Sequence, residues 1–112
     1  MDVTIEQQGD VSVVSVAGSI DALTSGQLTQ AFEEQIEAGQ VSLVADFSGV
    51  DYTSSAGLRA LLGAMKSSRT RGGDLRLAGI RSDVFRVLEM SGFTSILKVF
   101  DSVDEAIASF NS

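Results

Sequence analysis

Residues 41–62 read VSLVADFSGVDYTSSAGLRALL, and this stretch decides the fold class. Residues 41–47 are nearly all apolar, which is typical of a strand that is covered on both faces and is therefore central in its sheet. Apolar side chains then recur at three- and four-residue intervals from Leu58 to Met65, the spacing of one helix face. A buried strand followed by an amphipathic helix indicates an α/β protein.

Segments on both sides of this unit extend the pattern. Two alternating, β-branched segments precede it, and a turn at Gly9 between them predicts a β-hairpin. The next segment has apolar residues at helical spacing, with Ser25 as the expected N-cap and Gly39 as the stop. The remaining predicted elements are a strand at 74–80, a helix at 82–92, a strand at 96–100 and a helix at 101–110.

These elements predict one α/β domain that spans residues 1–112. The expected sheet is mixed, with about five strands and four helices in the order ββαβαβαβα. Strands joined through helices are parallel and right-handed, so the antiparallel hairpin should lie at one side of the sheet.

The amino-acid composition excludes most classes of catalytic site. The chain contains no cysteine and no histidine, so it lacks thiolate nucleophiles, the commonest general base and the commonest zinc ligand. Neither a Gly-x-Ser-x-Gly elbow nor a P-loop with its lysine is present. Asp46 and Asp51 flank the segment expected as a loop after the central strand, but two carboxylates without a third ligand are more typical of turns and caps. We therefore expect no enzyme activity, no metal and no cofactor.

The charge distribution restricts the partners. The formal net charge is −7, and all eight basic residues lie at or beyond Arg59. An acidic first half repels nucleic acid, which makes nucleic-acid binding a poor prediction. No apolar run reaches the roughly 18 residues that a membrane-spanning helix requires, and the first residues do not resemble a signal peptide. We therefore expect a cytoplasmic protein without membrane insertion.

Two adjacent serines, Ser54 and Ser55, lie at the expected start of the helix that carries Leu58. Either serine could cap this helix by accepting a hydrogen bond from a backbone N–H two or three residues further on. Because the helix needs only one cap, capping does not explain the second serine. A phosphoryl group here would meet free N–H groups and the positive end of the helix dipole, a gain of roughly 0.3–2 kcal/mol. The segment is thus better suited to be a substrate than a catalyst.

The segment LVADFSGVDYTSSAGLRALL, residues 43–62, resembles the signature of the STAS domain of anti-sigma-factor antagonists. GSIDA, residues 18–22, is similar to a second element of this family, and the likeness covers essentially the whole chain in length and element order. In the family, a serine two residues before the glycine of a Gly-Leu pair is phosphorylated, which corresponds to Ser55. Ser54 stands where many members have Asp and is the second choice, because it offers a competing hydroxyl.

The resemblance implies a regulatory antagonist that switches between partners. Unphosphorylated, it would bind an anti-sigma factor or related serine kinase with a histidine-kinase-like ATPase fold. Phosphorylation by that kinase would release it, and a metal-dependent serine phosphatase would reverse the modification. The residues expected at the partner surface are Asp21, Thr53, Ser54, Ser55, Ala56, Gly57 and Arg59.

Two alternatives come from other functional classes. The chain could be a STAS-like structural subunit without a switch, bound to a transporter ATPase or another regulatory complex. Such a complex would be insensitive to charge at Ser55. The third and weakest alternative is a domain that binds a nucleotide or another small molecule, with helix N-termini as anion sites.

Overall fold

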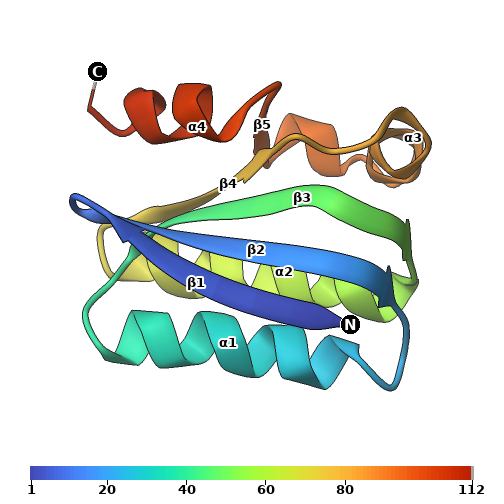
Figure 1. Cartoon of the computed structure of the whole chain (residues 1–112), viewed down its shortest axis with the longest axis horizontal. Helices are drawn as coiled ribbons and strands as arrows, with labels where there is room; N and C mark the ends of the chain where they lie inside the picture. Colours follow the sequence, from blue (N-terminus) through green and yellow to red (C-terminus); the bar gives the residue numbers. More distant parts are fainter. Residues whose placement is uncertain (112) are drawn as a thin grey trace.

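A computed structural model of the chain describes residues 1–111 (Figure 1). The element order predicted from the sequence, ββαβαβαβα, is confirmed, with one added 3₁₀ turn. The elements are β1 (Asp2–Gln8), β2 (Val11–Ile20), α1 (Ser25–Glu37), β3 (Ser42–Thr53), α2 (Ser55–Thr70), β4 (Asp74–Ala78), α3 (Ser82–Met90), η1 (Phe93–Ser95), β5 (Lys98–Phe100) and α4 (Val103–Ser109).

The five strands form one mixed sheet in the order β1-β2-β3-β4-β5. β1 and β2 pair in antiparallel fashion across a turn where Gly9 adopts a φ of 62°, a conformation that favours glycine. The other neighbouring pairs are parallel. The predicted hairpin at one side and the central position of β3 are therefore both confirmed.

Helices cover both faces of the sheet. Figure 1 shows α1 and α2 on one face and α4 on the other. The larger core lies beneath α1 and α2, and it includes the fully buried Phe32 of α1, Phe47 of β3 and Leu61 of α2. A smaller core around Val44 and Ala106 joins β3 to α4. Because both of its faces are covered, β3 needs the apolar sequence that identified it.

β3 extends further than predicted. The sequence indicated a strand that ends at Phe47 and a loop beyond it, whereas the strand continues to Thr53. The polar residues of the extension broke the apolar run, but Val50 and Thr53 still point into the protein and are buried. Irregularities in the pairing with β2 absorb extra residues along this extension. β3 therefore carries the chain directly to the start of α2.

Asp74, at the start of β4, joins the end of α2 to the sheet. One of its carboxylate oxygens accepts a hydrogen bond from Nε of Arg69 at 2.7 Å, and the other accepts from Nε of Arg76 at 3.0 Å. Burial alone would raise the pKa of Asp74, but the hydrogen bonds from the two guanidinium groups outweigh it, so the pKa lies below its usual value. Arg69 also donates to the carbonyl of Ile96 at 2.7 Å.

We predict that Asp74→Asn lowers the free energy of unfolding at neutral pH by about 2 kcal/mol, because two guanidinium groups lose their shared carboxylate. A lowered folded-state pKa stabilises the protein above the unfolded-state pKa of about 4, and this stabilisation is lost as the pH falls through the folded-state value. Urea denaturation should therefore show the difference from the wild type shrinking in acid. Asp2→Asn, on an exposed position of β1, is the control and should change little. If Asp74→Asn lowered the free energy of unfolding by the same amount at acidic pH as at neutral pH, the prediction would be contradicted.

Candidate functional site

The ends of two neighbouring strands meet the first turn of α2. Ile20, the last residue of β2, pairs with Thr53, the last residue of β3. The N–H of Ser54 then donates to the carbonyl of Ile20 at 2.8 Å. Thr53 is buried, and its hydroxyl donates to the carbonyl of Ser54 at 3.3 Å. The segment between β3 and α2 is therefore held by backbone contacts to β2.

Gly57 allows α2 to approach these strand ends closely. A Cβ atom at this position would clash with the hydroxyl of Thr53 and would lie 2.7 Å from Cγ2 of Ile20. The backbone of Gly57 is itself buried in the first turn of the helix. Thr53 and Gly57 therefore shape the site from below, and neither presents a side chain at the surface.

Ser54 and Ser55 differ in their environments. Ser54 is the N-cap of α2, and its hydroxyl accepts a hydrogen bond from the N–H of Gly57 at 3.4 Å. A serine N-cap of this kind contributes about 1 kcal/mol to helix stability. Ser55 is the first helical residue and is exposed, and its hydroxyl has no hydrogen-bond partner within residues 1–111. Ser54 is thus the helix cap, and Ser55 is the exposed serine.

The first turn of α2 has unused capacity for an anion. Within the described part of the chain, the N–H groups of Ser55 and Ala56 have no acceptor, as is usual for the first residues of a helix. Arg59 is exposed and lies four residues after Ser55, so the two side chains are on the same helix face. An anionic group on Ser55 would therefore lie near two N–H donors and a guanidinium group.

Asp21 organises the neighbouring segment between β2 and α1. Its Oδ1 accepts hydrogen bonds from the N–H groups of Leu23 and Thr24, both at 2.9 Å. The hydrogen bond from the N–H of Thr24, followed by the one from its hydroxyl and then the one from the N–H of Leu23, holds the pKa of Asp21 below its usual value. The carboxylate therefore remains charged throughout the neutral range. Because Ile20 is bound to Ser54, this acidic turn begins directly beside the start of α2.

The predicted cap of α1 was wrong. Ser25 is the first helical residue, and Thr24 is the N-cap but makes no side-chain capping bond. The Asp21 carboxylate already accepts from Thr24, and the N–H of Ser25 donates to the carbonyl of Asp21 at 2.9 Å. A compact turn built by Asp21 thus takes over the role expected of Ser25.

Two exposed apolar residues near this site were not predicted. Leu23, in the Asp21 turn, is 91% exposed, and Tyr52, which pairs with Ser19 next to the end of β3, is 54% exposed. Contiguous exposed apolar patches mark protein interfaces, whereas single exposed apolar residues are common on protein surfaces. Tyr52 was assigned to a loop because β3 was predicted too short. Leu23 carried no distinguishing sequence signal, since the turn around it depends on Asp21.

A groove continues from the site between α1 and α2. It has a volume of about 370 Å³, and Ala56 and Arg59 of α2 line it. From α1, Ser25, Thr29 and Glu33 contribute to the opposite wall. The exposed surface around Ser55 therefore includes both an arginine and a concave strip.

The two carboxylates considered as metal ligands have local partners. Oδ1 of Asp46 accepts from the N–H of Ser48 at 3.1 Å, and Oδ1 of Asp51 accepts from the hydroxyl of Ser19 at 2.9 Å. Across residues 1–111, no group of three potential metal-ligating side chains occurs. In the same range, no helix has the length and apolar character needed to cross a membrane.

Of the seven predicted partner residues, five lie at least partly at the surface of this region: Asp21, Ser54, Ser55, Ala56 and Arg59. The other two, Thr53 and Gly57, lie beneath it. The site is therefore compact, and it combines the turn after β2 with the first two turns of α2.

Comparisons with known proteins show the family and the fold of the chain. The family model of the STAS domain matches residues 2–106. An anti-sigma-B factor antagonist of Listeria monocytogenes is 36% identical over 95 residues, which cover 84% of this chain and 82% of that protein. The crystal structure of an anti-sigma factor antagonist from Mycobacterium paratuberculosis is 26% identical with a TM-score of 0.90, and it covers 99% of this chain and 94% of its own.

The Bacillus protein SpoIIAA, an anti-sigma factor antagonist, shares the fold. Its unphosphorylated form has a TM-score of 0.78 at 18% identity, and the alignment covers 99% of each chain. Its phosphorylated form has a TM-score of 0.76 at 19% identity, with 97% of this chain and 99% of SpoIIAA covered. This architecture therefore occurs in a protein for which both phosphorylation states have been solved.

We predict that Gly57→Ala destabilises the protein by about 1–3 kcal/mol, because the added methyl group would force α2 away from Thr53 and Ile20. Gly63→Ala, in the same helix, is the matched control. Its Cβ would meet nothing within 4 Å, so it should stabilise by about 0.5–1 kcal/mol through helix propensity alone. Chemical denaturation of both variants measures the contrast, and stabilisation by both would refute the close-packing argument.

Proposed function

The chain belongs to the STAS domain family, and on this basis we propose that it is an anti-sigma factor antagonist, a regulatory domain formed by residues 1–112. It would bind an anti-sigma factor and sequester it from another partner. We further propose that Ser55 is the residue whose phosphorylation ends this binding. The observation that carries the proposal is the division between the two serines: Ser54 caps α2, while the exposed hydroxyl of Ser55 has no partner within residues 1–111.

The environment of Ser55 would accommodate a phosphoryl group without a change of fold. The N–H groups of Ser55 and Ala56 are free to donate within the described chain, and Arg59 is one turn away on the same helix face. A negative charge at a helix N-terminus is worth roughly 0.3–2 kcal/mol. The modified protein should therefore be as stable as the unmodified one, or slightly more so.

The phosphoryl group would have to come from another protein. The chain contains no histidine or cysteine that could act as a general base. Its two lysines, Lys66 and Lys98, lie in the fourth turn of α2 and in β5, away from the first turn that carries Ser55. In the transfer, Oγ of Ser55 would form a bond to the γ-phosphorus of ATP while the bond to ADP breaks, and a base of the kinase would take the hydroxyl proton. This chain would supply only the acceptor.

The binding surface is proposed to include the Asp21 turn, Leu23, Tyr52, Ser55 and Arg59. Leu23 and Tyr52 provide apolar area, and the surface already carries the carboxylates of Asp21 and Asp51. Phosphorylation would add about −1.5 to −2 charges at its centre. Binding to the partner would then require the removal of water from the added phosphate charge. The partner surface, which fits an already acidic region, would not compensate this cost, and the complex would dissociate.

The partner is proposed to be an anti-sigma factor with a histidine-kinase-like ATPase fold that is itself the kinase. A serine phosphatase would restore the binding state. On this proposal the chain is a cytoplasmic protein without enzymatic activity of its own. The resemblance to anti-sigma-factor antagonists supports this choice of partner and phosphatase, and the proposed switch at Ser55 itself requires only ATP-dependent phosphoryl transfer and hydrolysis of a phosphoserine.

We predict that incubation with the cognate kinase and ATP adds one phosphate, and that mass spectrometry places it on Ser55. Ser55→Ala should abolish the modification. Ser54→Ala is the matched control: it removes the cap, at a cost of about 1 kcal/mol, but leaves the acceptor hydroxyl in place and should still be phosphorylated. A phosphate on Ser54, or none with any cognate kinase, would refute the assignment of Ser55.

We also predict that phosphorylation of Ser55 weakens the complex by about 2–5 kcal/mol, which is roughly 30-fold to several thousand-fold in affinity. Ser55→Asp carries less charge and should weaken binding by about tenfold or more, whereas Ser55→Ala should bind but resist release. Ser91→Asp, at the exposed end of α3, adds the same charge elsewhere and serves as the control. A complex that tolerates Ser55→Asp would favour the alternative of a structural subunit without a switch.

A further inference from the structure

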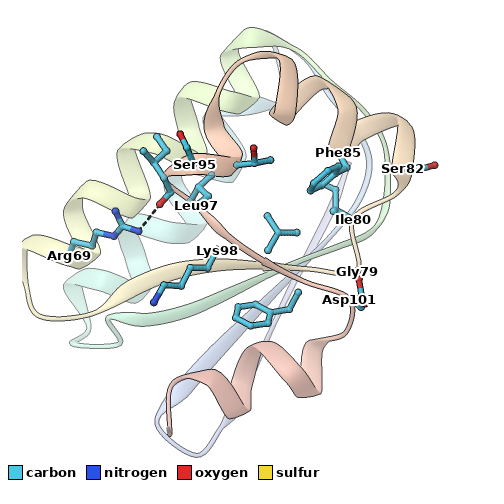
Figure 2. A pocket seen from close by; sticks show the side chains of 13 residues that line it. Arg69, Gly79, Ile80, Ser82, Phe85, Ser95, Leu97, Lys98 and Asp101 are labelled. Carbon is cyan, nitrogen blue, oxygen red and sulfur yellow. Dashed lines mark hydrogen bonds between the residues drawn. The ribbon is translucent and has the colours of Figure 1, made fainter.

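A pocket of about 1010 Å³ lies beside β5, away from the site around Ser55 (Figure 2). Residues of α3, η1 and β5 line it, together with Arg69 from the last turn of α2. None of the seven predicted partner residues is among them. Its volume is at the upper end of the range of roughly 300–1,000 Å³ that is typical of small-molecule sites.

Apolar side chains form part of the walls of this pocket, beside polar and charged ones. Ile80, Phe85, Val99 and Phe100 line it and are only partly buried, and Ile96 is 39% exposed. Figure 2 shows the side chains of Ile80 and Phe85 lying close together at one end. Removing such surface from water is favourable in proportion to the apolar area covered. The pocket therefore suits the hydrocarbon part of a ligand.

The opposite end of the pocket is basic. Figure 2 shows Arg69 and Lys98 there, whereas Asp101 lies near Gly79 at the other end. Arg69 shares the carboxylate of Asp74 with Arg76. Lys98 pairs with Arg76 across β4 and β5, so two cations are direct neighbours.

This end carries more positive than negative charge. Arg69 and Lys98 line it, and the carboxylate of Asp74 is shared between Arg69 and Arg76, whereas the ammonium group of Lys98 has no ionic or hydrogen-bond partner within residues 1–111. Such an excess is unusual in a chain with a net charge of −7. An anion beside Lys98 would offset the repulsion between neighbouring cations, while a cationic ligand would add to it.

We propose that this pocket binds a small amphipathic anion, namely a carboxylate with an unbranched acyl chain. The hydrocarbon chain lies against Ile80, Phe85 and Ile96, and the carboxylate lies at the Lys98 end. This pocket is separate from the surface around Ser55, and the proposal holds whether or not Ser55 is phosphorylated.

Titration of the isotope-labelled protein with octanoate, followed by amide NMR shifts, tests the proposal. Saturable shifts should cluster in α3, η1 and β5. 1-Octanol and octylamine have the same chain with a neutral and a cationic head. Octanoate should bind about two- to fivefold more tightly than octanol, the size of one exposed charge interaction, and octylamine should bind most weakly. Absence of saturable shifts, shifts confined to other regions, or equal binding of octylamine would overturn the proposal.

Two pairs of matched variants separate the charge from the apolar wall. Lys98→Ala should weaken octanoate binding about two- to fivefold, while Lys66→Ala, which removes the only other lysine, should leave it unchanged. Ile96→Asp places a carboxylate in the wall and should abolish saturable binding. Ile5→Asp is its control, because Ile5 is exposed to a similar degree, 42% against 39%, but lies on β1. Equal effects within either pair would refute the assigned contact.

Discussion

The close approach of α2 to the ends of β2 and β3 is the constraint on which the site depends. Gly57 has no side chain, so the first helical turn can lie against Thr53 and Ile20, and Ser54 can bond to the backbone of β2. This contact places the Asp21 turn beside the helix N-terminus. It also directs one serine into the cap and leaves Ser55 at the surface. The absence of a side chain at Gly57 is thus one condition for this arrangement.

The fold followed from the sequence because its signals are periodic and local. The apolar run of β3 and the helical spacing after Leu58 depend on burial, which the amino-acid pattern records directly. The extension of β3 to Thr53 could not be read in this way, because its irregular pairing with β2 interrupts the alternation of side chains. The same limitation hid Tyr52. Ser54 and Ser55 could be placed at the helix start, but the choice of cap required the position of the first helical turn, which is set by tertiary contacts.

The two ends of α2 favour charges of opposite sign, and each end belongs to a different proposed site. Ser55 is the first residue of the helix, where the dipole favours an anion, and Arg69 lies in its last turn, where the dipole favours a cation. These residues are 14 positions apart, so they are separated by about 21 Å along the helix axis. That distance exceeds the screening length of about 8–10 Å at physiological ionic strength. A phosphate at Ser55 would therefore have little direct electrostatic effect on an anion held near Lys98.

The proposed switch works through binding rather than through refolding. The groups that would donate hydrogen bonds to the phosphate, namely the N–H groups of Ser55 and Ala56 and the side chain of Arg59, are already in place in the unmodified chain. The modification would therefore stabilise the free protein slightly while it destabilises the complex. The second effect drives dissociation, because a stabilisation that is present in both the free and the bound state cancels between them. A rigid domain can thus act as a switch when the only quantity that changes is the charge at one exposed hydroxyl.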